Sequence, residues 1–207
     1  MNALKAVPVA EPNLTSVRRP VVTVASLNLG YFGIEFAVAR AIGSVSLFAD
    51  SIDFLEDAAV NGLILIALGW GVRQRSIVGM VLAAVLFAPG AATLWTAWEK
   101  FNAPLPPAAL PLMLTGLGAL AVNLFCAFSL ARVRAHRGSL TRAAFLSARN
   151  DTLANVAIIV AGLVTAIVPS PWPDLVVGVG IFAMNLDASQ QVYSAARDEH
   201  RVSVADD

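Results

Sequence analysis

The chain has few charged side chains, one cysteine and two histidines among its 207 residues. Charged residues make up 14% of the chain, whereas 57% of it is hydrophobic and its mean hydropathy is +0.72. This composition excludes an ordinary soluble domain and predicts a polytopic membrane protein. The single cysteine, Cys126, excludes an internal disulfide framework, and its position in an apolar run indicates a small packing residue.

The beginning of the chain lacks the uninterrupted apolar core of a signal peptide, because prolines and polar residues interrupt residues 1–20. We expect these residues to form a flexible cytosolic arm. Six apolar windows follow, and at roughly 20 residues per crossing the chain has room for about six membrane spans. The windows lie near residues 21–42, 45–71, 77–98, 108–131, 143–168 and 173–194. The predicted fold is therefore all-α, with a six-helix transmembrane domain over residues 21–194 and a short cytosolic tail at 195–207.

Five breaks separate these windows, and each has a physical basis in glycine, proline or charge. A glycine and a serine follow the first window, a charged turn follows the second, and a segment with three prolines follows the third. A basic loop and a rigid proline turn follow the fourth and the fifth. The predicted breaks are Gly43–Ser44, Gly71–Ser76, Asn102–Pro107, Arg132–Arg142 and Pro169–Pro173.

The basic residues outside the apolar windows fall almost entirely on one side of a six-span topology. Positive loops stay on the cytoplasmic side of a membrane, so this distribution sets the orientation. The opposite side holds only Arg40 and Lys100. Both termini are therefore expected to be cytosolic. The cytosolic set comprises Lys5, Arg18, Arg19, Arg73, Arg75, Arg132, Arg134, Arg137, Arg142, Arg197 and Arg201.

The second window carries acidic side chains that a lipid-facing helix would not tolerate. An ionised carboxylate near the bilayer centre costs about 2.5 kcal/mol or more, so it normally faces a partner, a water-filled cavity or a cation. Asp50, Asp53, Asp57 and Asn61 are spaced at i, i+3, i+7 and i+11, which places them on one helical stripe. Asp53 and Asp57 are neighbours one turn apart, so their charges repel unless a cation or a shared proton lies between them.

The fifth window carries a second polar stripe. Ser147, Asp151 and Asn155 are spaced at i, i+4 and i+8, and Asn150 lies beside them. If this stripe faces the acids of the second window across the bundle, oxygen atoms from two helices converge. Oxygen donors of this kind hold divalent cations. The two windows therefore predict a cation path through the membrane.

Other acidic residues have structural readings beside the functional one. Asp50 and Glu56 lie nearer a helix end, where a cap or a pair with a basic group such as Arg40 explains Asp50 equally well. In the first window, Glu35 shares a face with Asn28, and the two are either a proton group or an interhelical hydrogen-bond pair, with the second favoured. The accessory or proton groups are accordingly Asp50, Glu56, Glu35 and Asn155.

Three segments in order resemble signatures of the cation diffusion facilitator family, whose members export divalent transition metals, generally in exchange for protons. Residues 28–36 resemble the first-helix pattern, residues 45–59 the second-helix signature and residues 146–163 the fifth-helix signature. The resemblance covers roughly residues 20–195. It implies a six-helix cation transporter, not an enzyme, without a prosthetic group. The metal ligands that it implies, together with their neighbours, are Asp53, Asp57, Asp151, Ser147 and Asn150.

The chain departs from the family pattern at two points. Ser147 stands where the family usually has a histidine, and no histidine lies in any window, because His136 is in the basic loop and His200 in the tail. A site of carboxylates, amides and hydroxyls is harder and less zinc-selective than a nitrogen or sulfur site, so zinc, cadmium, cobalt, iron and manganese stay open as cargo. The residues after the sixth window are too few for the family's cytosolic metal-binding domain. A homodimer would therefore have to form through membrane helices or another protein.

The expected function is efflux of a divalent transition metal, coupled to protons by alternating access. The expected partners are metal ions, protons and the lipid bilayer of the plasma (inner) membrane, with no nucleic acid. One alternative is an accessory membrane protein that does not transport. Another is an intramembrane metal-dependent transferase, but Asp53 is followed by Phe54 where one such class, the CDP-alcohol phosphotransferases, carries glycine after its second aspartate.

Overall fold

The computed structural model describes residues 14–67, 77, 91–134 and 138–185. Every regular element in these ranges is an α-helix, which confirms the all-α prediction. Six helices are described. They are α1 (Leu14–Ile42), α2 (Val45–Ala67), a helix at 91–102, α4 (Ala109–Arg134), α5 (Gly138–Ile167) and the helix Trp172–Asn185.

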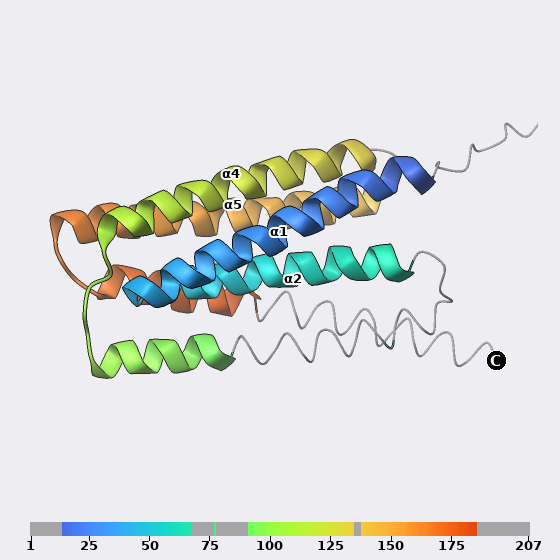
Figure 1. Cartoon of the computed structure of the whole chain (residues 1–207). Coiled ribbons are helices and arrows are strands. Elements are labelled where there is room, and N and C mark those ends of the chain that lie inside the picture. Colours follow the sequence, from blue (N-terminus) through green and yellow to red (C-terminus); the bar gives the residue numbers. More distant parts are fainter. Residues whose placement is uncertain (1–13, 68–76, 78–90, 135–137, 186–207) are drawn as a thin grey trace, which may run out of the picture.

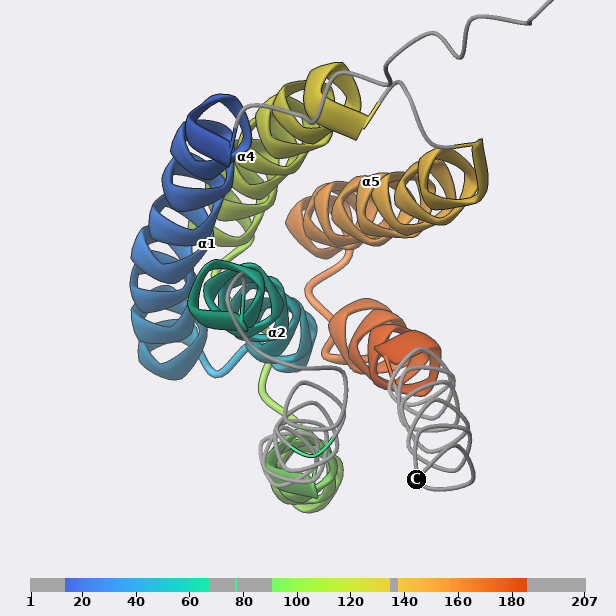
Figure 2. The same cartoon turned by 90° about the vertical axis from the view of Figure 1, so that its right-hand side faces the viewer.

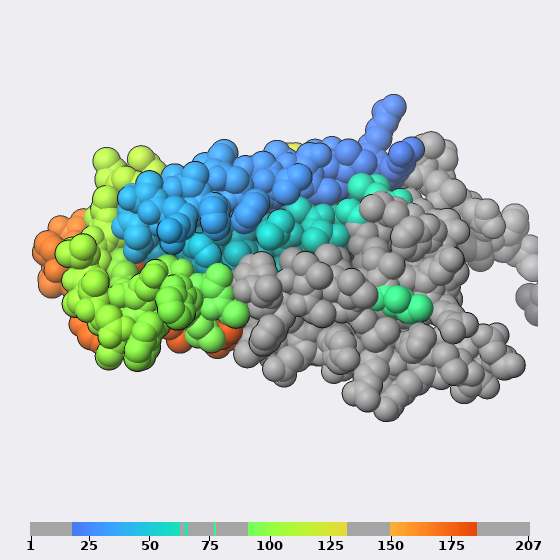
Figure 3. All heavy atoms as spheres, turned by 60° about the horizontal axis from the view of Figure 1, so that its bottom comes forward, coloured from blue at the N-terminus to red at the C-terminus, as the bar shows by residue number. Residues whose placement is uncertain are grey.

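The acidic helix α2 lies in the middle of the bundle. In Figure 2, α1, α4 and α5 form an arc on one side of α2, and helices 91–102 and 172–185 lie on the other side. The long helices run side by side along the bundle in Figure 1. α1 packs extensively against α2, and α4 against α5, whereas α2 meets α5 over a short stretch only. In Figure 3, α2 is visible as a teal band that runs alongside α1.

Three of the described helices are long and apolar enough to cross a membrane: Arg18–Ile42, Ala109–Ala131 and Asn150–Ile167. The helix Trp172–Asn185 is apolar but shorter over its described length. α2 has 23 residues but carries four carboxylates, so its interior position in the bundle keeps them away from lipid. The architecture is that of a helical membrane bundle.

The turn between α1 and α2 follows the predicted break. Gly43 has a positive φ of 64°, a conformation that glycine adopts without steric cost. The Ser44 amide then donates to the Ala39 carbonyl at 3.0 Å, which closes the last turn of α1. The hydroxyl oxygen of Ser44 accepts the Leu47 amide at 3.1 Å and so caps α2. One glycine and one serine therefore end one helix and begin the next.

Asp174, near the start of helix 172–185, fastens the beginning of α2. Its carboxylate accepts the main-chain N–H of Val45 at 2.9 Å and of Ser46 at 3.2 Å, and both serine hydroxyls of this turn at 2.6 Å. Lys100 of helix 91–102 pairs with Asp174 at 3.3 Å and also donates to the Gly43 carbonyl. Because an anion at a helix N-terminus is favoured by the helix dipole, this buried ion pair ties three helices together.

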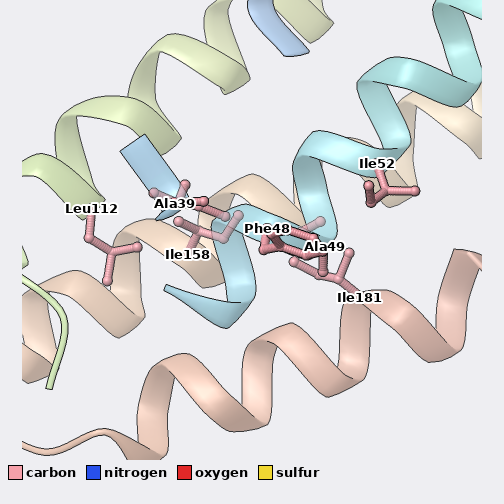
Figure 4. Packing of buried hydrophobic residues seen from close by; sticks show 9 residues of the cluster. Ala39, Phe48, Ala49, Ile52, Leu112, Ile158 and Ile181 are labelled. Atoms are coloured by element: carbon pink, nitrogen blue, oxygen red, sulfur yellow. The ribbon is translucent and has the colours of Figure 1, made fainter. Parts of the chain in front are cut away.

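Glycine allows helix 172–185 to approach α2 at backbone distance. A Cβ atom at Gly178 would lie 2.7 Å from the carbonyl carbon of Val45, so only glycine fits there without a shift. The apolar core continues from this contact. Figure 4 shows Ile181 of helix 172–185 beside Phe48 and Ala49 of α2. The same core includes Ile158 of α5. Residues of α2 and of four other helices thus form one apolar core.

The predicted basic loop Arg132–Arg142 is wrong in extent. α4 continues to Arg134 and α5 begins at Gly138, so most of the predicted loop is helical. Arginine, alanine and leucine are good helix formers, and their propensity carries both helices past the apolar windows. α1 likewise begins at Leu14, inside the predicted arm at 1–20. The predicted break at Gly71–Ser76 lies outside the described residues.

Candidate metal centre

The second helix places its acidic residues along one buried stripe. Asp50 is 1% exposed, and Asp53, Glu56 and Asp57 are half-buried. Phe54, one turn after Asp50 on the same side of α2, is 1% exposed and packs against Tyr31 of α1 at 5.0 Å between ring centroids, so this side of the helix is turned towards the bundle. The helix therefore presents a line of carboxylates to the interior of the bundle.

The fifth helix brings Asp151 to these acids. Asp151 is half-buried, and among the charged neighbours of Asp53 it exerts the largest electrostatic interaction. It also interacts electrostatically with Asp57 and Asp50. Figure 2 shows α2 and α5 facing each other across the bundle, in agreement with these interactions. The structure thus gathers carboxylates of two helices that are far apart in the sequence.

An asparagine lies one turn after each of two aspartates. Asn61 donates its amide N–H to the main-chain carbonyl of Asp57 at 2.8 Å, and Asn155 donates in the same way to Asp151 at 2.7 Å. Both asparagines are buried, and no residue in the described part of the chain donates a hydrogen bond to their side-chain carbonyl oxygens. Buried polar atoms normally have a partner, so these two oxygens point to an interior that holds water or a cation.

Sequence reasoning missed the neighbours that orient Asp57. The amide of Asn28 in α1 donates to the Asp57 carboxylate at 3.4 Å, and the thiol of Cys126 in α4 donates to the Asn28 carbonyl oxygen at 3.5 Å. Asn28 and Glu35 were predicted to be either a proton group or interhelical hydrogen-bonding residues, and Asn28 does bond to another helix, with Asp57 of α2 as its partner. The only signal in the sequence was a polar residue in an apolar window, which does not name the helix that it meets.

Glu35 and Asp50 lie together between α1 and α2. Glu35 is completely buried, and its carboxyl group interacts with that of Asp50. No side chain in the described ranges donates a hydrogen bond to any of the four oxygens. The reading of Asp50 as a helix cap or as a partner of Arg40 is therefore wrong. Asp50 lies beyond the first turn of α2, and the Arg40 side chain is exposed.

The remaining candidates are less closely placed. Asn150 is half-buried on α5, next to Asp151. Ser147 lies on the same helix, but its side chain is outside the described residues, as is His136. Within the described part of the chain, no three His, Cys, Asp or Glu side chains are close enough to form a complete metal cage in this conformation. The carboxylates of α2 and α5 face each other, but they do not surround one common position.

The comparison with known families decides the identity of this bundle. Residues 21–197 match the family described as "Cation efflux transmembrane domain". The chain belongs to the cation efflux family. The match covers all six described helices except the first turns of α1, and it includes every candidate ligand. This cation efflux protein is an integral membrane protein of a family that transports divalent cations as substrates.

The candidate ligands of this cation efflux protein offer oxygen atoms. Asp53, Asp57 and Asp151 carry carboxylates, and Asn150 and, one turn from the aspartates, Asn61 and Asn155 carry amide oxygens. These groups neutralise the charge of a divalent cation and replace part of the hydration shell of that cation. Carboxylates that repel one another in the empty state are stabilised when a cation arrives. The arrangement is chemically suited to bind a divalent cation inside the membrane.

Proposed function

We propose that this protein exports a divalent transition-metal ion and that Asp53, Asp57 and Asp151 bind the ion near the middle of the membrane. Asn150 and Ser147 of α5 supply further oxygen donors. The orientation that we propose has both termini in the cytosol, and the proposed location is the plasma membrane. The ion enters from the cytosol and leaves on the opposite side by alternating access of the same site.

The electrostatic interaction between Asp53 of α2 and Asp151 of α5 carries this proposal. Intramembrane carboxylates are expensive, and several on two facing helices need a common cation. The side-chain oxygens of Asn61 and Asn155, to which no described residue donates a hydrogen bond, lie on residues one turn from Asp57 and Asp151, which supports an interior lined with polar groups.

The short stretch over which α2 meets α5 supports alternating access. α1 and α2 are packed along their length, as are α4 and α5, but the seam between α2 and α5 is thin. Since α1 also packs against α4, a small rotation about the α1–α4 interface changes the separation of Asp151 from Asp53 and Asp57 while α1 stays packed on α2 and α4 on α5.

The ligand atoms of this site determine which metal it prefers. Zinc favours nitrogen and sulfur ligands, whereas carboxylate and amide oxygens suit manganese and other harder divalent ions. We therefore expect a broad series that includes manganese, iron, cobalt and cadmium as well as zinc. Protons compete with the metal for carboxylate oxygens, so metal release and proton uptake are linked. Glu56 is half-buried beside Asp57 and serves as an accessory proton group in this scheme.

Transport by the purified protein in proteoliposomes tests the proposal. Uptake of manganese, iron, cobalt, cadmium and zinc is followed with and without a pH gradient. We expect metal-dependent transport by the parent protein, accelerated by the gradient. Asp53→Asn and Asp151→Asn should each abolish transport, because the carboxamide keeps the shape of the side chain and loses the charge that binds the cation.

Glu99→Gln is the matched control, since it makes the same kind of change at an exposed carboxylate, which accepts a hydrogen bond from Trp95 at 3.0 Å. Its transport should equal that of the parent. Full transport by Asp151→Asn in correctly folded protein would show that the ligand assignment is wrong. The absence of transport of any ion by the parent protein would refute the function itself.

A further inference from the structure

A pair of carboxyl groups separate from the proposed metal ligands is enclosed between α1 and α2. Glu35 is 0% exposed and Asp50 is 1% exposed, and the two groups interact directly. Within the described ranges, none of their four oxygen atoms receives a hydrogen bond. Two ionised carboxylates that are buried without hydrogen-bond donors repel each other and cost much free energy. The pair therefore requires a positive charge between its members.

The surroundings favour a proton over a metal ion at this position. Phe36 packs against Phe48 at 5.5 Å, and Tyr31 against Phe54 at 5.0 Å, so aromatic contacts join α1 to α2 on both sides of the pair. The Tyr31 hydroxyl is already bound to the Thr115 carbonyl at 2.6 Å. Metal ions take four or more ligands, and two carboxylates in a packed apolar seam do not provide them. One proton shared between two carboxyl groups supplies the missing donor.

We propose that Glu35 and Asp50 hold one proton between them, and that this proton, bound apart from the metal, leaves when the metal binds. This inference rests on the proposed function. The electrostatic connection is direct, because Glu35 interacts with Asp53, and Asp50 interacts with Asp57 and Asp151. A divalent cation among the proposed ligands repels the shared proton through the same interactions. Metal and proton thus exclude each other without competing for the same oxygens.

Other titratable groups around the pair are few. Tyr31 of α1, Asp53 and Asp57 of α2, and Asp151 of α5 act on it. Among the described side chains, α4 contributes only the Cys126 thiol, and helix 172–185 contributes only Asp174, which is bound to Lys100 and to the start of α2. The described ranges place no basic side chain in contact with Glu35 or Asp50, so a proton is the available counter-charge.

Proton release on metal binding tests the inference directly. Zn²⁺ is titrated into the purified protein by calorimetry in two buffers of different ionisation enthalpy at one pH, which gives both the dissociation constant and the number of protons released. Glu35→Gln and Asp50→Asn should each release about one proton fewer per Zn²⁺ than the parent, and their dissociation constants should fall less steeply with rising pH. In proteoliposomes, the same variants should keep Zn²⁺ exchange at equal pH and lose its acceleration by a pH gradient.

Glu99→Gln is again the matched control and should release as many protons as the parent. Equal proton release by Asp50→Asn and the parent would overturn the inference, and so would loss of Zn²⁺ binding by the folded variant, since the pair would then be a metal ligand. If a variant does not fold, infrared spectroscopy of the parent decides. A protonated carboxyl band must disappear when Zn²⁺ is added, and a band that is absent or unchanged refutes the shared proton. A parent that binds no Zn²⁺ or other tested metal would instead refute the proposed function.

Discussion

Replacement of Asp174 by alanine should destabilise the protein more than replacement of its partner Lys100. The Asp174 carboxylate is 0% exposed and accepts five hydrogen bonds, one from Lys100 and four from the first turn of α2. Asp174→Ala leaves a buried ammonium group without its counter-ion. It also removes the acceptor of the main-chain N–H groups at the start of α2. Asp174→Ala therefore removes the ion pair and the cap of α2 at the same time.

The structure sets the size of the two effects. Breaking a buried ion pair by removing one partner costs about 3–5 kcal/mol, and we expect this loss for Asp174→Ala. Lys100→Met removes the hydrogen bonds of Lys100 to Asp174 and to the Gly43 carbonyl, and the bond between the two charged groups accounts for about 1.5–3 kcal/mol of the loss. The Asp174 anion then keeps its four donors from α2 and the favourable helix dipole. The difference between the variants therefore reflects the role of Asp174 as the cap of α2.

Reversible unfolding of the purified protein in mixed detergent micelles, followed by helical circular dichroism, gives the free energy of unfolding of each variant. Glu99→Gln, at an exposed site on the same helix as Lys100, is the control and should match the parent. An equal loss for the two variants, or a smaller loss for Asp174→Ala, would contradict the reasoning, because the contacts with the start of α2 would then contribute nothing.

Three further predictions concern packing, orientation and selectivity. Gly178→Ala should lower the free energy of unfolding by about 1–3 kcal/mol because its Cβ meets the α2 backbone, whereas Gly180→Ala, with nothing within 4 Å, should leave the same unfolding measurement unchanged. Asn28→Leu should weaken metal binding about 10–100-fold in calorimetric titration by freeing the Asp57 carboxylate, and unchanged affinity would remove Asn28 from the site. Ser147→His should shift transport toward zinc in the ion panel, because an imidazole nitrogen suits zinc, and an identical selectivity series would disprove the placement of Ser147 at the site.

The helical architecture was predictable because its causes are local. Apolar windows of membrane-spanning length and breaks at Gly43–Ser44 and Asn102–Pro107 fixed where helices end. The stripe of acids on α2 was also predictable, since 3.6 residues per turn put these positions on one face. The basic loop at Arg132–Arg142 was predicted wrongly, because charge was read as a break although arginine and alanine favour helix.

The sequence by itself determined that this protein is an all-helical membrane bundle with carboxylates inside, because composition and helical periodicity are properties of single segments. Tertiary structure alone decided which partners those carboxylates have. Periodicity defines a face but not the helix that it meets, so the contact of Asn28 with Asp57, the pairing of Glu35 with Asp50 and the ion pair of Lys100 with Asp174 had no signal in the chain. These contacts bring together residues from separate helices, and they arise only when the bundle packs.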